Sequence, residues 1–138
     1  MQAEALRAVS AAGRTRKRPV LLFEPFFVLR HTVTVVAQEL GVAEIVEAAT
    51  PEVAGQLLRA RAFAGCIVSM DDAGQGLELI RTLRMGTTAS PEAVPIAVTT
   101  AACDAEMIAT LKDLRVARIV LKPFKVKLIL QTITQLVA

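Results

Sequence analysis

Residues 119–124 read Ile-Val-Leu-Lys-Pro-Phe, a short apolar run followed at once by a lysine and a proline. Further upstream, residues 94–101 read Val-Pro-Ile-Ala-Val-Thr-Thr-Ala. Both segments contain an apolar run of strand length, which is typical of a strand buried on both faces of a parallel sheet. The two segments therefore predict buried strands, over 94–98 and 119–121, that are followed by polar side chains.

Similar apolar runs occur nearer the N-terminus, at 19–23, 43–48 and 66–68, with apolar residues at helical spacing between them. Thr50-Pro51 predicts a helix start, Asp104 predicts a second cap, and Gly41 predicts a helix end. The expected apolar faces are Leu29, Val33, Val36, Ala37 and Leu40; Leu57 and Leu58; Leu77, Ile80 and Leu83; Met107, Ile108, Leu111 and Leu114; and Val126, Ile129, Leu130, Ile133 and Leu136.

Five strands that alternate with five helices predict an α/β fold with a doubly wound, five-stranded parallel sheet. Right-handed connections favour the flavodoxin-like strand order 2-1-3-4-5 in a (βα)5 arrangement. A site is then expected where the first and third strands end, at Glu24-Pro25 and Ser69-Met70. We predict one domain over residues 18–138, preceded by a basic and flexible N-terminal tail over residues 1–17.

The composition is apolar, with 54% hydrophobic residues and a mean hydropathy of +0.51. No run approaches the roughly 18 apolar residues of a membrane helix, so we expect a cytoplasmic protein whose surplus apolar surface meets a partner or a second copy. Cys66 and Cys103 are expected to be isolated, buried and reduced. The basic run of Arg14, Arg16, Lys17 and Arg18 predicts a solvated tail, because the absence of Trp and Tyr disfavours nucleic-acid binding.

The segments at 94–101 and 119–124, together with Gly76-Leu77-Glu78 as the start of a third helix, resemble the response-regulator receiver domain of the chemotaxis-regulator kind. The resemblance covers about residues 18–138. It implies that a histidine kinase passes a phosphoryl group to an aspartate at the end of the third strand, while acidic residues after the first strand hold Mg²⁺. Thr100 and Lys122 match the hydroxyl and the lysine that bind the phosphoryl oxygens.

Other positions depart from the receiver pattern. Glu24-Pro25 stands where the acidic pair belongs, so Glu24 is the residual acid. The phosphoacceptor position falls on Ser69 when it is counted from Phe63, and on Val68 when it is counted back from Gly76. A serine hydroxyl is a poorer nucleophile than a carboxylate unless a base lies beside it. In addition, Ile119 replaces the family's switch aromatic.

We therefore predict a degenerate pseudo-receiver that has no catalytic residue, bound metal or cofactor and is not an enzyme. It would act in two-component signal transduction as a phosphorylation-independent interaction module for a histidine kinase, a phosphotransfer protein or an output protein. Lys122 is expected to pair with Glu24. A homodimer could form through the fourth helix, fifth strand and fifth helix, which carry charges of both signs. The alternative is that these residues are ordinary surface charges: Lys112, Asp113, Arg115, Arg118 and Lys125.

The alternative is a phosphorylatable receiver that uses Asp71 or Asp72 as acceptor and requires Mg²⁺. Both residues could instead be solvated loop residues, or caps of the helix that follows. An enzyme or cofactor binder on the same architecture is disfavoured, because Pro25-Phe26-Phe27 replaces the Gly-rich phosphate loop after the first strand. His31 is expected to be a surface residue and not a phosphorelay histidine.

Overall fold

The computed structural model describes residues 18–72 and 74–138. The expected tail over 1–17, with Arg14, Arg16 and Lys17, lies outside these residues. The elements in chain order are β1 (Pro19–Phe23), α2 (Phe27–Glu39), β2 (Glu44–Ala48), α3 (Pro51–Ala60), β3 (Gly65–Ser69), α4 (Gln75–Arg84), β4 (Ile96–Thr100), α5 (Ala105–Asp113), β5 (Arg118–Leu121) and α6 (Val126–Leu136).

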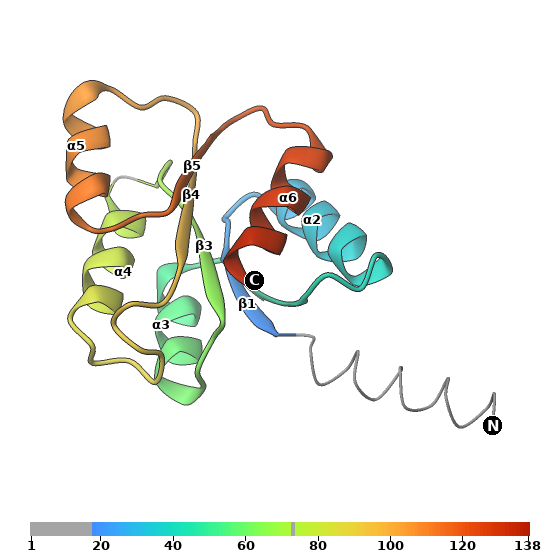
Figure 1. The fold of residues 1–138 in the computed structure, drawn as a ribbon, viewed down its shortest axis with the longest axis horizontal. Coiled ribbons are helices and arrows are strands. Elements are labelled where there is room, and N and C mark those ends of the chain that lie inside the picture. The colour runs from blue at the N-terminus through green and yellow to red at the C-terminus, as the bar shows by residue number, and fades with distance from the viewer. Residues whose placement is uncertain (1–17, 73) are drawn as a thin grey trace.

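The five strands form one parallel sheet in the order β2-β1-β3-β4-β5, which confirms the predicted topology. Helices α2 and α6 cover one face, and α3, α4 and α5 cover the other (Figure 1). The core is correspondingly split in two. Leu21, Phe23 and Val68 point toward α3–α5, whereas Leu22 and Ile67 point toward α2 and α6. This alternation follows from the two-residue period of a strand that is buried on both faces.

The predicted helix starts are confirmed. Thr50 Oγ1 accepts the backbone N–H of Val53 at 3.2 Å, and Asp104 Oδ1 accepts the N–H of Met107 at 2.8 Å. Each bond satisfies one of the amides that a helix leaves without an internal partner. Gly41 follows the end of α2 with φ of 63°, a conformation that glycine adopts readily.

Four sequence-based expectations about a strand boundary and about buried helix positions were wrong. Val126, expected on the apolar face of the last helix, is exposed at the first position of α6. β4 begins at Ile96 and not at Val94, because the Val94 N–H bonds to Pro91 in a turn and Pro95 has no N–H to give to the ladder. Leu40 is exposed, since it caps the C-terminus of α2 beyond the last buried turn. Ile108 is also exposed, because Leu111 is the buried residue of the short helix α5.

Arg84 ties three segments together at the amino edge of the sheet. Its guanidinium group donates to the carbonyl oxygens of Leu114 at 2.7 Å, Glu92 at 2.6 Å, Val94 at 2.7 Å and Arg115 at 3.2 Å. A guanidinium group has five N–H donors in a fixed fork, so it can serve several carbonyl acceptors at once. Arg84 therefore joins the end of α4 to the loop before β4 and to the end of α5.

The two cysteines differ in environment. Cys66 is fully buried in β3, and burial raises the pKa of its thiol to about 12, although the charge of Arg84 acts in the opposite direction. Cys103 is only partly buried, so the expectation that both thiols are buried was wrong for this residue. Among the described helices, none is long and apolar enough to cross a membrane.

Candidate functional site

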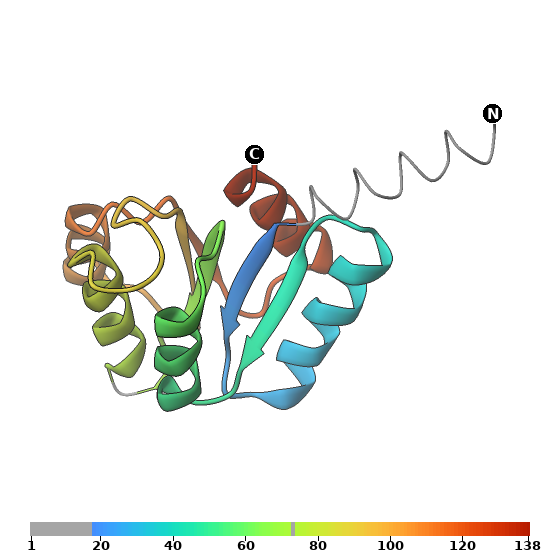
Figure 2. The ribbon, with the colours of Figure 1, turned by 90° about the horizontal axis from the view of Figure 1, so that it is seen from below.

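The candidate site is a polar pocket at the carboxyl edge of the sheet. Helix α2 follows β1 on one face, while α4 follows β3 on the other (Figure 2). Such a reversal leaves a crevice outside the strand ends. Ser69 and Thr100 are the last residues of β3 and β4, and Glu24 and Lys122 directly follow β1 and β5. The structure thus brings four of the predicted site residues to one edge.

The Lys122 ammonium group lies at the centre of this pocket. Its Nζ atom is 2.7 Å from Glu24 Oε1 and 3.0 Å from Asp71 Oδ2, and it donates to the Ser69 hydroxyl at 3.1 Å. The expected ion pair with Glu24 is confirmed. Burial alone would lower the pKa of Lys122, but the hydrogen bonds and charges of the two carboxylates outweigh burial and raise this pKa. Lys122 is therefore a stable cation at neutral pH.

Asp71, two residues beyond β3, turns its carboxylate into the same pocket. Its Oδ1 atom accepts the backbone N–H of Ala101 at 2.9 Å and lies 3.1 Å from Thr100 Oγ1. Burial acts to raise the pKa of Asp71, but the hydrogen bonds from Ala101, Lys122 and Thr100 and the Lys122 charge lower it overall. Asp71 is thus an exposed residue of the loop after β3, but its carboxylate also takes part in the pocket.

Thr100 is buried, and its hydroxyl has two acceptors within reach. Thr100 Oγ1 lies 2.8 Å from the carbonyl oxygen of Ala102 and 3.1 Å from Asp71 Oδ1. A hydroxyl carries one hydrogen, so these acceptors share a single donor. The backbone N–H of Ala101 has no such competition, and it reaches both carboxylate oxygens of Asp71, at 2.9 and 3.2 Å.

Asp72 bonds to the first turn of α4, close to the capping role considered for it, although Gly74 occupies the N-cap position. Its Oδ1 atom accepts the backbone N–H of Gly76 at 2.9 Å, near the start of α4. Gly76 is packed so closely against the end of β3 that a Cβ atom would collide with the carbonyl oxygen of Ser69. The start of α4 is therefore fixed against β3, and this contact helps to set the position of the intervening loop.

Glu24 is buried, and both of its carboxylate oxygens are already bonded. Oε1 pairs with Lys122, and Oε2 accepts the N–H of Phe26 at 3.0 Å. Pro25 is exposed and has neither a side-chain oxygen nor an amide hydrogen. No group of three or more His, Cys, Asp or Glu side chains suited to a metal ion occurs within residues 18–72 and 74–138. Mg²⁺ commonly binds through one or two carboxylates and several waters. Both carboxylates of the pocket, Glu24 and Asp71, are paired with the Lys122 ammonium group, which Mg²⁺ would have to displace, so the residues as arranged fit this ion poorly.

The two possible acceptor positions point in opposite directions. The Ser69 hydroxyl is fully buried and faces Lys122, whereas the Val68 side chain lies in the core beneath α3–α5. Ile119, at the position of the switch aromatic, is partly buried against that same core. Of the two possible acceptor positions, only Ser69 therefore reaches the pocket. The described pocket holds Glu24, Ser69, Asp71, Thr100 and Lys122.

The Ala101 donor could not be predicted from the sequence, because a backbone N–H leaves no signal in residue type. His31 is exposed on α2, where its ring stacks on Phe27 at 5.3 Å between centroids, as expected for a surface residue.

The charged residues of the expected dimer face also lie at or near the surface, and Arg118 donates to Gln135 at 2.8 Å.

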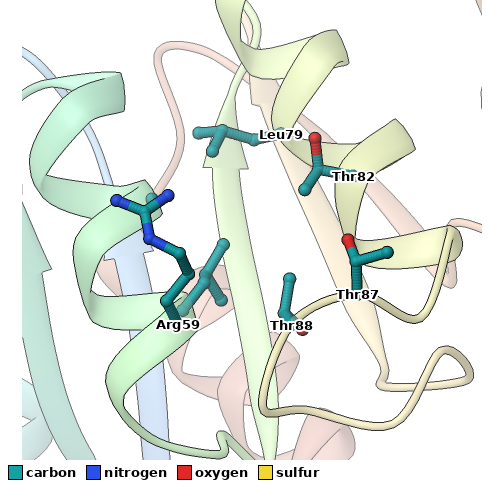
Figure 3. A pocket seen from close by; sticks show the side chains of 7 residues that line it. Arg59, Leu79, Thr82, Thr87 and Thr88 are labelled. Carbon is teal, nitrogen blue, oxygen red and sulfur yellow. The ribbon is translucent and has the colours of Figure 1, made fainter.

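Two of the surface hollows bear on the site, one by lying apart from it and one by bordering it. One, of about 380 Å³, lies between α3, α4 and the loop after α4, and shares no residue with the pocket (Figure 3). The other, of about 390 Å³, borders the pocket at Lys122 and is mainly apolar, lined by Phe26, Leu29, Ala101, Lys122, Pro123 and Phe124. Phe26 and its neighbours Phe27 and Val28 are all largely exposed.

No family model and no curated protein matches the sequence. Solved structures do match it. The chemotaxis protein CheY4 of Vibrio cholerae is 22% identical, with 86% of this chain and 98% of that chain covered and a TM-score of 0.76. A response regulator receiver protein from Pseudomonas putida is 25% identical, with coverages of 86% and 97% and a TM-score of 0.76. The HemR receiver domain from Leptospira biflexa is 23% identical, with coverages of 88% and 95% and a TM-score of 0.76.

These similarities extend over nearly the whole length of each matched receiver chain. They agree with the strand order and the two helical layers. The chain therefore has the flavodoxin-like fold of response-regulator receiver domains.

Proposed function

We propose that the chain is a pseudo-receiver, a non-enzymatic module of two-component signal transduction that binds a regulatory protein without being phosphorylated. The observation that carries this proposal is the buried hydroxyl of Ser69, which stands at the acceptor position and is held by Lys122 at 3.1 Å. A cytoplasmic location is part of the proposal. The partner would be a histidine kinase, a phosphotransfer protein, an output protein or a second copy.

The chemistry around Ser69 supports the absence of phosphotransfer. A serine needs a neighbouring base to become a nucleophile. Lys122 is the group bonded to its hydroxyl, and its raised pKa keeps it protonated, so it cannot take the proton. The Glu24 carboxylate, in turn, is bonded to Lys122 and to the N–H of Phe26. Together with the poor fit to Mg²⁺, this leaves Ser69 without an activating group.

The face formed by α5, β5 and α6, which are the fourth helix, fifth strand and fifth helix of the domain, supports a role in protein binding. Each of these elements has one large apolar side chain that is substantially exposed: Ile108 on α5, Leu121 on β5 and Val126 on α6. Exposed apolar groups that lie among charges of both signs are typical of a docking surface, and they suit pairing with a second copy in particular. β5 is an edge strand that pairs with β4 alone, so its other side adds backbone groups without a strand partner to this face.

The proposal is tested by incubating the protein with acetyl phosphate and Mg²⁺ and measuring its intact mass. We expect the mass to stay unchanged. The gain of one phosphoryl group that hydroxylamine removes would overturn the proposal, since it would report an acyl phosphate.

The competing function, a receiver phosphorylated on Asp71 or Asp72, has one observation in its favour. Asp71 does lie against Thr100 and Lys122. The same incubation with Asp71→Ala and Asp72→Ala variants separates the two acceptors, because the modification would disappear only in the variant that lacks its acceptor. Ser69→Ala serves as the control for a serine ester, which resists hydroxylamine.

A further inference from the structure

Three donors from separate positions meet on the carboxylate of Asp71. They are the Ala101 N–H at 2.9 Å, the Lys122 ammonium at 3.0 Å and the Thr100 hydroxyl at 3.1 Å, whose one hydrogen is shared with the Ala102 carbonyl oxygen at 2.8 Å. Thr100 ends β4, Ala101 begins the next loop and Lys122 follows β5, so the sheet itself fixes all three. A hydroxyl, an amide and an ammonium that face one point form a binding site for a small oxyanion.

The Asp71 side chain is the outermost member of this cluster. About 33% of it is exposed, compared with 17% of Lys122 and 5% of Glu24. Removing its carboxylate would therefore open the donors to solvent and would not leave a sealed cavity. The backbone near Asp71 is fixed from both sides, because Gly76 abuts the Ser69 carbonyl and Asp72 bonds to the first turn of α4.

We propose that the Asp71 carboxylate is a resident anion, a built-in ligand that permanently fills an oxyanion site formed by Thr100, Ala101 and Lys122. Without it, the site would accept a singly charged oxyanion such as formate or acetate from solution. This inference deepens the proposed function. The binding site itself is independent of that function, and only its meaning in signalling rests on it. A pocket that contains its own anion does not depend on an incoming phosphoryl group.

The charges of the pocket determine which ligand class fits. Lys122 contributes one positive charge, and Glu24 and Asp71 contribute one negative charge each. Exchanging the Asp71 carboxylate for formate keeps this balance. A phosphate dianion would add a further negative charge close to Glu24, and like charges at short range repel strongly in a partly buried site. We therefore expect formate to bind better than phosphate.

The test is a titration of the full chain with sodium formate, followed through the backbone amide resonances. We expect saturable shifts at the Ala101 amide in Asp71→Ala and in Asp71→Ser, together with a rise in melting temperature that sodium chloride at equal ionic strength does not produce. The wild type should show neither response. Glu39→Ala is the matched control, because it removes an exposed carboxylate from the end of α2, outside both the pocket and the α5–β5–α6 face. It should behave like the wild type.

A double variant, Asp71→Ala with Thr100→Val, should lose most of the formate response. If Asp71→Ala is unfolded on its own, refolding on addition of formate is the expected result, and Asp71→Ser provides the same titration with a polar side chain. No saturable response in either folded variant, or an equal response in the wild type, overturns the resident anion. An unmodified mass after acetyl phosphate would still support the proposed function, so the two failures are distinguishable.

Discussion

At the scale of single residues, Lys122 neutralises one of the two negative charges of the pocket. Only 5% of the Glu24 side chain is exposed, and its carboxylate lies 2.7 Å from Lys122 Nζ. Removing one partner of a buried ion pair costs about 3 to 5 kcal/mol, because the remaining charge stays uncompensated. We expect Lys122→Met to lower the free energy of unfolding by about 3 kcal/mol in urea denaturation.

The control for this prediction removes both charges. Glu24→Gln combined with Lys122→Met leaves no uncompensated ion in the buried part of the pair, so it should recover much of the lost stability. If Lys122→Met proves as stable as the wild type, the ion pair does not stabilise the fold.

Asp71 makes part of the stability depend on pH. Its pKa in the folded chain is below 3.8, so its contribution is complete above pH 3.8 and disappears as the pH falls through the lower folded value. Lys122 has the opposite sign, because its raised pKa gives a contribution that is complete below pH 10.5 and disappears as the pH rises through the higher folded value.

We therefore expect the wild type to be more stable than Asp71→Ala near neutral pH, and the difference to shrink below pH 3.8. Urea denaturation of both proteins across acid pH measures this difference. A stability difference that stays constant into strong acid would show that the Asp71 carboxylate does not stabilise the folded state through its charge.

At the scale of secondary-structure elements, Arg84 supports the amino edge of the sheet. It donates to carbonyl groups of the loop that leads from α4 to β4, and to carbonyl groups at the end of α5. A hydrogen bond from a charged group contributes about 1.5 to 3 kcal/mol, and bonds that share one donor group are not additive. We expect Arg84→Ala to destabilise the chain by about 3 kcal/mol in urea denaturation, and Arg84→Lys to lose less.

Arg81→Ala is the matched control for Arg84. It removes an exposed arginine from the same helix, and exposed substitutions generally change stability by less than about 0.5 kcal/mol. Equal destabilisation by the two variants would mean that helix α4 depends on arginine content and not on the carbonyl contacts.

The elements with strong apolar periodicity were predictable from the sequence, and the less regular positions were not. The runs at 19–23 and 66–68 gave β1 and β3 nearly unchanged, because a strand buried on both faces needs little beyond apolar side chains. Leu40 and Ile108 fit the helical spacing and yet are exposed. Periodicity identifies a helix face, but the neighbouring elements decide how far along the helix that face stays covered.

The residues of the pocket, too, were only partly predictable from the sequence. The pair of Glu24 and Lys122 could be predicted, since both residues follow parallel strands that end at one edge of the sheet. The position of Asp71 could not, because it depends on the path of an irregular loop. That path is constrained by the contact of Gly76 with the Ser69 carbonyl, which only the folded backbone reveals.

At the scale of the whole molecule, the face formed by α5, β5 and α6 is the expected site of self-association. Leu121 is 56% exposed on β5, the edge strand of the sheet. We expect the wild type to form dimers at high concentration in light scattering. Leu121→Glu should weaken the dimer at least about tenfold, which corresponds to about 1.4 kcal/mol, because it places a charge in an apolar contact.

Leu40→Glu provides the control for this surface. Leu40 is 62% exposed, similar to Leu121, but it lies at the end of α2, a helix that packs on β2 at the edge of the sheet opposite β5. The dimer should be unaffected by this variant. A wild type that remains monomeric at all concentrations would leave the α5–β5–α6 face to a different protein, and equal weakening by both variants would place the contact elsewhere.

The contrast between the two cysteines makes the unaltered chain suitable for spectroscopic labelling. Alkylating reagents react with the thiolate, and the pKa of about 12 at Cys66 keeps that buried group in its thiol form. Cys103 is partly exposed and lies shortly after Thr100, in the loop that leads from the pocket to α5. A fluorine or spin label could therefore be attached next to the pocket of the folded protein, without replacing either cysteine.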